Sequence, residues 1–380
     1  TITCNSEYGD ESLQVRYSGD GQLFDVDHSY LADLLESGLL LNIVRPHIGK
    51  NGELLPEFII LEPDFLVDVS TISSCFESYA ESPLVSLLKR LEPQSSSEAI
   101  LMGNMAGELL DRLLHEADAQ DLSEQTLKKI YLESVQNFFR NNAVGIMTVL
   151  PGREFHTNSW QQMLNIRNAL VNILPGQLCR YDSDNIIVEP TFFSEMLGLQ
   201  GRMDMLQADM RVLVEQKAGK AAFVPGATDY TTPTHKEQHY VQMLLYMAII
   251  RYNYRHIYDE NNQELHAFLL YSKYSHPLVG LGFAPKLLFR AIKVRNQYVA
   301  QEEIFSKGGA DILMSLNADD INEKKVCGKF WAQFQRPRIE YMLANLQGAS
   351  ELEKAYSMEK AYRGGETRYR KRVHNQPYYR

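Results

Sequence analysis

A strand, a turn, a second strand and a helix follow one another in the middle of the sequence, and this order constrains the fold more than any other feature. Apolar and polar residues alternate at 202–206 and again at 211–217, which is typical of half-buried β-strands. A tight turn centred on Asp209 and Met210 would join them. From about 235 to 252 the apolar spacing is that of a helix. The order predicts an α/β fold.

Three charged side chains are predicted to share one face of this hairpin. With the turn in that position, Asp204 lies opposite Glu215, and Lys217 follows Glu215 by two residues. Two carboxylates are the hard oxygen ligands that Mg²⁺ or Mn²⁺ prefers, and a neighbouring lysine can orient a water or neutralise charge at a phosphate. A solvated surface cluster is the alternative interpretation.

The following helix carries a polar row. His239, Gln242 and Tyr246 occur at positions i, i+3 and i+7 and therefore lie on one face of an otherwise apolar helix. Such a row is suited to gripping a polar chain beside a metal ion. A core helix whose polar residues are satisfied by hydrogen bonds is the alternative interpretation.

The motifs of this region resemble those of the RecB-like group of PD-(D/E)XK nucleases. The sequence reads G-x-x-G-R-x-D at 198–204, then E-x-K at 215–217, then Q-x-x-x-Y at 242–246. The H-x-x-Q-x-x-x-Y run and LLYSKY at 269–274 look most like the nuclease region of flap-processing helicase–nucleases and their bacterial relatives. The resemblance implies a restriction-endonuclease-like mixed sheet flanked by helices. It also implies a metal-dependent deoxyribonuclease that cuts single-stranded or flap DNA in repair, replication or recombination.

The resemblance assigns a role to each matching position. Asp204 and Glu215 would bind the metal ion together with the backbone carbonyl of Gln216, and Lys217 would position the attacking water. Two further positions match the Q-x-x-x-Y motif, and they would hold the lysine or the DNA backbone near the ion: Gln242 and Tyr246. Weaker candidates for DNA contact are His239 and Lys273.

One metal-binding position of the family is different in this chain. Relatives carry G-x-x-x-H on an earlier helix, and here Gly103 matches the glycine while Gly107 stands in place of the histidine. Glu108 or Asp111 could supply the missing ligand, and an ordinary solvated helix face is the alternative. The change motivates a rival hypothesis, in which the chain is a nuclease-fold module that binds DNA but cuts weakly. A defence or restriction nuclease acting on duplex DNA is a third hypothesis.

Cysteine usage argues against a metal cluster. The four cysteines are Cys4, Cys75, Cys179 and Cys327. They are far apart and form no C-x-x-C pair, and Ser82 stands where many relatives have the first cysteine of an iron–sulfur site. We therefore expect no iron–sulfur cluster, and we expect reduced core cysteines in a cytoplasmic protein.

Composition limits the possible partners. The 380 residues carry a net charge of −10, which argues against coating nucleic acid broadly but allows a narrow basic channel. No apolar run is long enough to span a membrane. The sequence has no G-x-x-x-x-G-K-[ST] motif, so a helicase partner would have to be another domain or subunit. Because the chain begins with Thr1, we expect a fragment of a longer protein.

The pattern along the chain predicts three regions. We expect a small β-rich, barrel-like module at 1–64, a nuclease domain at 65–347 and a C-terminal helix, basic tail or linker at 348–380. Within these regions, strands are predicted at 12–18, 57–63, 185–193 and 265–274, a helix-like segment at 29–41, and helices across 117–180 and 285–347.

Overall fold

The protein is α/β, with mixed sheets and many helices, and it divides into two compact units. The computed structural model describes residues 1–7, 9, 12–18, 27–91, 96–115, 123–306 and 315–348. Unit 1 contains the described residues of Thr1–Pro93, Phe193–Gly201 and Ala284–Arg380, and unit 2 those of Gln94–Phe192 and Arg202–Phe283. The predicted basic tail, from residue 349 onward, lies outside the described residues.

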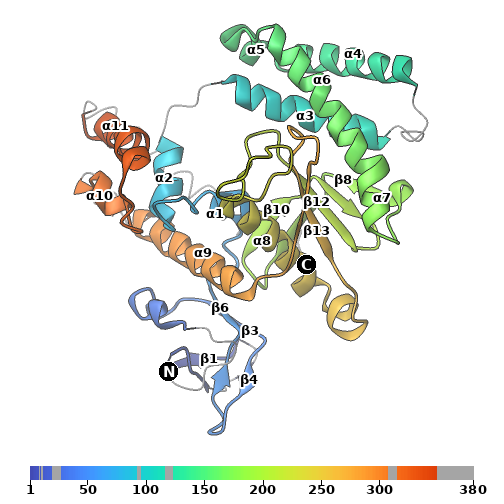
Figure 1. Ribbon diagram of the computed structural model, residues 1–380. Helices are drawn as coiled ribbons and strands as arrows, with labels where there is room; N and C mark the ends of the chain where they lie inside the picture. The colour runs from blue at the N-terminus through green and yellow to red at the C-terminus, as the bar shows by residue number, and fades with distance from the viewer. Residues whose placement is uncertain are drawn as a thin grey trace. The chain divides into compact units, whose positions relative to one another are not determined.

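Unit 1 combines short strands near the N-terminus with helices from both ends of the sequence (Figure 1). Its elements are β1 (Ile2–Asn5), β2 (Ser12–Val15), η2 (Ser29–Asp33), β3 (Leu41–Val44), β4 (His47–Ile48), β5 (Leu54–Leu55), β6 (Phe58–Leu61), β7 (Val67–Asp68), α1 (Val69–Ser73), α2 (Pro83–Leu91), α9 (Pro285–Ser306), α10 (Ala318–Ile321), η7 (Trp331–Gln335) and α11 (Arg336–Gly348). Two more strands carry the chain between the units: β9 (Thr191–Ser194) and β10 (Leu199–Arg202).

The N-terminal segment forms strands but, in its described part, no closed barrel. β1, β2, β5 and β4 form one sheet, and β3 pairs with β6 in another. The barrel-like expectation is therefore wrong for these residues, because strands of two to four residues offer too few hydrogen bonds to close a sheet on itself. The strands predicted at 12–18 and 57–63 are confirmed as β2 and β6. The segment predicted to be helix-like at 29–41 is helical only in the short 3-10 helix η2. Its last residue, Leu41, begins the strand β3, which pairs with the buried strand β6.

A buried arginine of α9 joins two other parts of unit 1. The Nε of Arg295 donates to the carbonyl of Gly198, and its Nη atoms donate to the carbonyls of Leu61, Glu62 and Phe65. Gly198 has a φ of 60°, and a Cβ at this position would overlap the guanidinium. Glycine is therefore required here for two reasons, a left-handed backbone and the close approach of Arg295.

Unit 2 consists of helices and a five-stranded sheet. Its elements are α3 (Glu98–His115), α4 (Glu124–Asn141), α5 (Ala143–Val149), α6 (Arg153–Asn168), η3 (Ala169–Ile173), α7 (Leu174–Gln177), η4 (Ser183–Asn185), β8 (Ile186–Val188), β11 (Met205–Gln207), β12 (Val212–Gln216), α8 (Glu237–Asn253), η5 (His256–Glu260), β13 (His266–Leu270) and β14 (Leu278–Leu281). These elements confirm the helices predicted across 117–180 for residues 123–177, whereas 117–122 lie outside the described residues. They also confirm a helix near 235–252 and a strand near 265–274.

The sheet of unit 2 is mixed and has the order β14-β13-β12-β11-β8. β12 and β13 are parallel, and the other neighbouring pairs are antiparallel. In the β11–β12 hairpin Met205 lies opposite Val214, and continuing this register places Asp204 opposite Glu215. Met210 has a φ of 61°, and its N–H donates to the carbonyl of the third residue before it, which closes the turn. The predicted turn position and register are confirmed.

Helices cover both faces of this sheet. Residues of α3, α4 and α6 form a hydrophobic core with one face, and α8 packs against β13. Side chains alternate along β12, so Glu215 and Lys217 point toward α8 and Gln216 points the other way. The amide of Gln216 donates to the hydroxyl of Ser272, which donates to Gln162 of α6. Glu215 and Lys217 therefore lie on the α8 face, and Gln216 lies on the face that packs against α6.

Two of the predicted strands are each interrupted by a short break. The segment 185–193 divides into β8 and β9 at Glu189 and Pro190, and the segment 202–206 divides into the end of β10 and β11 just before Met205. Proline has no N–H for the ladder, and Glu189 adopts a φ of 50°. The N–H of Glu189 donates to the carbonyl of Asp204, which lies in the second break. The two breaks therefore lie against each other.

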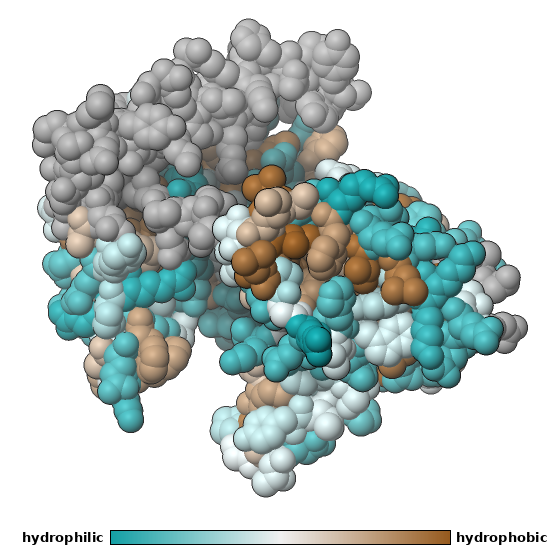
Figure 2. All heavy atoms as spheres, turned by 90° about the horizontal axis from the view of Figure 1, so that it is seen from above, coloured by the Kyte–Doolittle hydropathy of each residue, from teal (hydrophilic) through white to brown (hydrophobic). Residues whose placement is uncertain are grey.

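One helix of unit 2 leaves apolar side chains uncovered. Val144, Met147 and Leu150, in α5 and just after it, are 81%, 75% and 77% exposed. Figure 2, which views the molecule from above, shows apolar residues gathered on the face seen from that side. In the described part of the chain, no helix is both long enough and apolar enough to cross a membrane.

The cysteines are free thiols, but they do not share one environment. Cys75 is buried and Cys4 is half-buried, whereas Cys179 and Cys327 are exposed. The expectation of four core cysteines is therefore wrong for the two exposed ones, because they lie in polar connecting segments between helices and strands.

Candidate active site

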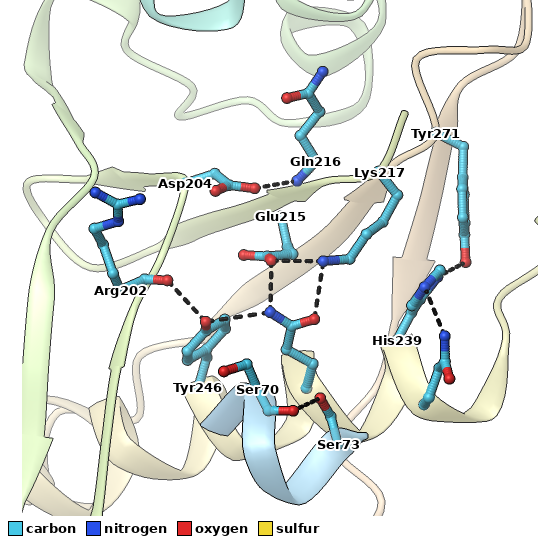
Figure 3. Close-up of polar contacts among 12 residues, drawn as sticks. Ser70, Ser73, Arg202, Asp204, Glu215, Gln216, Lys217, His239, Tyr246 and Tyr271 are labelled. Atoms are coloured by element: carbon cyan, nitrogen blue, oxygen red, sulfur yellow. Dashed lines mark hydrogen bonds and ion pairs between the residues drawn. The ribbon is translucent and has the colours of Figure 1, made fainter. Parts of the chain in front are cut away.

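A carboxylate, a lysine and an amide form a closed triangle on the α8 face of the sheet. The Nζ of Lys217 donates to Glu215 Oε1 at 2.8 Å and to Gln242 Oε1 at 2.9 Å. The Nε2 of Gln242 donates to the same oxygen of Glu215 at 2.7 Å. Figure 3 shows these contacts between the end of β12 and α8. Residues predicted from two separate motifs, E-x-K and Q-x-x-x-Y, therefore touch one another.

The tyrosine of the Q-x-x-x-Y motif extends this triangle to the hairpin. Gln242 and Tyr246 lie one turn apart on α8, and the Gln242 amide donates to the Tyr246 phenol oxygen at 3.3 Å. The Tyr246 hydroxyl donates to the carbonyl of Arg202 at 2.8 Å. The motif thus fixes α8 against the chain segment that leads into Asp204.

Asp204 is held beside the triangle by a backbone bond. Its Oδ2 accepts from the N–H of Gln216 at 2.6 Å (Figure 3). Burial raises the pKa of the Asp204 carboxyl, and the positive charge of Lys217 opposes that rise. The backbone bond fixes the carboxylate while its other oxygen remains available for a ligand.

Glu215 is a buried carboxylate with one oxygen that accepts no hydrogen bond. Its side chain is only 5% exposed, and its Oε2 atom is buried without a hydrogen-bond partner. Burial raises the pKa of Glu215 to about 7; Lys217 opposes this rise and the charge of Asp204 adds to it. A buried carboxylate oxygen without a donor is costly, and a bound cation would relieve it.

A third carboxylate belongs to the same electrostatic group. Burial raises the pKa of Asp111 to about 6, and the charges of Glu189, Asp204 and Glu108 add to the rise. α3, which carries Asp111 and Glu108, contacts β8 next to the hairpin. The structure therefore brings Asp111 into range of Asp204, and the repulsion between them favours a cation.

Gly107 faces open space. A Cβ built there would meet no atom within 4 Å. A histidine side chain would therefore have room here, on the same helix as Asp111. Its absence leaves the carboxylates of α3 as the helix's candidate ligands.

The two weaker DNA-contact candidates differ in their surroundings. His239 is half-buried, and its Nδ1 lies 2.8 Å from the Tyr271 hydroxyl. Burial lowers the pKa of His239 to about 3, and the charges of Lys217 and Lys236 lower it further, so the ring is neutral at physiological pH. Lys273 is exposed in the loop after β13. His239 thus lies near Lys217, whereas Lys273 makes none of the hydrogen bonds of the triangle.

Glu189 is a further neighbour of these carboxylates. Its side chain pairs with Arg202 at 3.0 Å. Its charge nevertheless raises the pKa of both Asp204 and Asp111. A glutamate directly before a proline at a strand break is the signal that could have pointed to it.

The residues present suit a hard divalent cation. Among the described residues, no three histidine, cysteine, aspartate or glutamate side chains are already arranged as a metal site. Two carboxylates with raised pKa values nevertheless lie beside each other, the half-buried Asp204 and the buried Glu215 with its orphaned oxygen. Oxygen donors of this kind are what Mg²⁺ and Mn²⁺ bind. The donor set therefore fits such an ion.

Comparisons with known proteins add no family to this description. A scan against models of protein families found no match, and a search of curated proteins found none that matches significantly. The function of the chain therefore has to be inferred from the geometry of the site.

Proposed function

We propose that this chain is a metal-dependent deoxyribonuclease that hydrolyses phosphodiester bonds of single-stranded or flap DNA. The observation that carries the proposal is the buried Glu215, which has one oxygen in the triangle with Lys217 and Gln242 and the other without a partner. Buried carboxylates with raised pKa values beside a lysine occur more often at functional sites than elsewhere.

The carboxylates would hold the metal ion. Asp204 and Glu215 are the principal ligands in this proposal, and the carbonyl of Gln216 and the side chains of Asp111 and Glu108 are the supplementary ones. A bound Mg²⁺ or Mn²⁺ would supply Lewis-acid chemistry and lower the pKa of a water molecule. The raised pKa values of these two carboxyls support this role, because the cation would replace protons there.

Lys217 would serve the reacting phosphate. Its ammonium group is held by Glu215 and Gln242, and its side chain is 19% exposed, so one side of it remains accessible. A cation in this position can orient an attacking water and neutralise the charge that develops on the phosphate oxygens. Gln242 and Tyr246 position this lysine through the hydrogen bonds that link it to the hairpin.

We further propose a fold type, a partner and a location for this enzyme. The mixed sheet flanked by helices would be of the restriction-endonuclease-like kind, with DNA as the partner and the cytoplasm as the location. A helicase domain or subunit would supply the single strand. The net charge of −10 requires that DNA reach the site through a local contact surface rather than a broad basic face.

The direct test is cleavage of end-labelled single-stranded, flap and duplex DNA in Mg²⁺ or Mn²⁺. We expect cutting of the first two substrates and a loss of about 100-fold or more in Lys217→Ala. Lys129→Ala is the control, because Lys129 is an exposed lysine of α4 with a side chain that is 77% exposed. Cutting that persists in Lys217→Ala would point to a contaminating nuclease.

The same assay separates the rival functions. A nuclease-fold module that only binds DNA would retain the labelled single strand without cutting it in either metal. The open space at Gly107, where related nucleases carry a metal-binding histidine, is the observation that favours this second candidate. Preferential cutting of the duplex would instead indicate a restriction or defence nuclease.

A further inference from the structure

A continuous row of aromatic rings runs from the site to an exposed loop of unit 2. His239 packs against Tyr271 with ring centroids 5.6 Å apart, and Tyr271 contacts Tyr274 at 6.5 Å. Phe223 then contacts Tyr274 at 5.4 Å, and Tyr230 contacts Phe223 at 5.1 Å, both edge to face. The first ring of the row lies close enough to Lys217 to feel its charge.

The loop that carries the outer rings connects two catalytic elements. It comprises residues 218–236 and runs from the strand end with Lys217 to the start of α8. The N–H groups of Ala222 and Thr234 donate to each other's carbonyls, at 3.2 and 2.7 Å, which closes its base. The hydroxyls of Tyr274 and Tyr271 accept from the N–H groups of Ala221 and Lys236. The loop is thus anchored at both ends.

The tip of this loop presents a ring to solvent. Tyr230 is 63% exposed, although one edge of it is supported by Phe223. The carboxylate of Asp229 accepts from both the N–H and the hydroxyl of Thr231, which fixes the backbone on either side of the ring. A supported but uncovered aromatic ring is a surface on which a planar group can stack.

Positive charge accompanies the row. Lys220 is exposed near the start of the loop, and Lys273 is exposed next to Tyr274. Two further lysines, Lys217 and Lys236, lie close enough to His239 for their charges to lower its pKa, although burial lowers it more. An aromatic ladder beside lysines is the combination that proteins use to bind single strands, because the rings stack with bases and the ammonium groups meet phosphates.

We propose that Tyr230, supported by Phe223 and Tyr274, is a base-stacking platform for single-stranded DNA, which the loop 218–236 presents beside the cleavage site. This assignment rests on the proposed nuclease function for its substrate. Bases in a duplex are stacked on each other and leave no free face for Tyr230, whereas an unpaired base has two. The platform therefore selects single strands through their bases and not only through their phosphates.

The test compares two probes that differ only in their bases. Binding of fluorescent oligothymidylate is compared with binding of an abasic oligonucleotide of the same length, with Ca²⁺ replacing Mg²⁺ to slow cleavage. We expect tighter binding of oligothymidylate by the wild type. Tyr230→Ala should weaken this binding roughly ten-fold and leave abasic binding unchanged. Tyr230→Phe, which keeps the ring, should bind like the wild type.

A matched control is available in unit 1. Tyr341 is 63% exposed, like Tyr230, so Tyr341→Ala removes an equally exposed ring elsewhere. The platform is overturned if Tyr230→Ala binds oligothymidylate as tightly as the wild type does, if the wild type binds both probes alike, or if it binds neither. An equal loss in Tyr341→Ala also overturns it.

Failure of the platform and failure of the proposed function give different results. If oligothymidylate is cut in Mg²⁺ or Mn²⁺ while Tyr230→Ala binds normally, the nuclease stands and the platform falls. If Tyr230→Ala loses base-dependent binding while the wild type cuts nothing, the platform stands and the nuclease function falls.

Discussion

Each unit of this protein buries a charged group in its interior, and the two groups are treated in opposite ways. In unit 1, Arg295 is fully buried, and each of its three nitrogens donates to at least one backbone carbonyl. In unit 2, Glu215 is 4% exposed, and its Oε2 atom has no donor. One charge is satisfied by the fold, and the other is not.

The difference shows what each group contributes. A buried charge whose hydrogen bonds are all made holds a structure together, and removing it leaves its partners unsatisfied. A buried carboxylate with a raised pKa and an oxygen that accepts no hydrogen bond weakens the fold, and such groups persist where a ligand compensates for them. Arg295 is thus structural, whereas the metal ion that we propose would compensate for the burial of Glu215.

The largest effect is expected in unit 1. Arg295→Leu removes the guanidinium donors from four carbonyls, those of Leu61, Glu62, Phe65 and Gly198. The carbonyls of Glu62 and Gly198 each keep one backbone donor. We expect the free energy of unfolding to fall by about 3 kcal/mol, measured by urea denaturation. Arg336→Leu is the control, because Arg336 makes exposed ion pairs with Asp319 and Glu340 and should change stability by less than about 1 kcal/mol. Equal effects of the two substitutions would contradict a structural role for Arg295.

A smaller effect is expected from breaking the triangle of unit 2. Gln242→Leu keeps the volume of the side chain but removes its bonds to Lys217, Glu215 and Tyr246. Lys217 then lacks one of its two anchors, and we expect cleavage of single-stranded DNA to slow about ten-fold. Gln238→Leu, one turn earlier on α8, is the matched control and should cut at nearly the wild-type rate. If Gln242→Leu also cuts at that rate, the amide does not position the lysine.

The site could be predicted from the sequence where its parts are close along the chain. The two-residue period of the strands and a turn at Asp209 and Met210 fix the register that places Asp204 opposite Glu215 and points Lys217 to the same side. The helical spacing of Gln242 and Tyr246 places both on one face. These are local rules, and the hydrogen bonds within the site follow them.

The remaining features depend on contacts between distant segments. The approach of Asp111 to Asp204 requires the packing of α3 beside β8, which no local period encodes. The donors of Arg295 find carbonyls more than 90 residues away in sequence, which a pattern of burial along α9 does not reveal. The open N-terminal sheets differ from the expected barrel because strand pairing, rather than strand propensity, decides closure.

The smallest effect is a change in the pH dependence of stability. Burial raises the pKa of Glu215 from its ordinary 4.5 to about 7, so the folded protein holds a proton that the unfolded chain has released within this range. The free energy of unfolding therefore falls as pH rises from about 4.5 to 7, by up to about 1.4 kcal/mol per pH unit. Glu215→Gln removes this contribution, while the pKa of Asp111, raised to about 6 mainly by burial, keeps a slope of the same sign below pH 6.

We therefore expect Glu215→Gln to gain about 1 kcal/mol or more relative to the wild type between pH 5 and pH 8, in denaturant titrations with EDTA. The control is Glu124→Gln, at a side chain that is 76% exposed and paired with Lys128, and its stability relative to the wild type should be the same at both pH values. Added Mn²⁺ should stabilise the wild type more at pH 8 than at pH 6, because protons compete for the same oxygens, and it should not stabilise Glu215→Gln. A variant that follows the wild-type pH dependence would mean that Glu215, like Arg295, is satisfied by the fold.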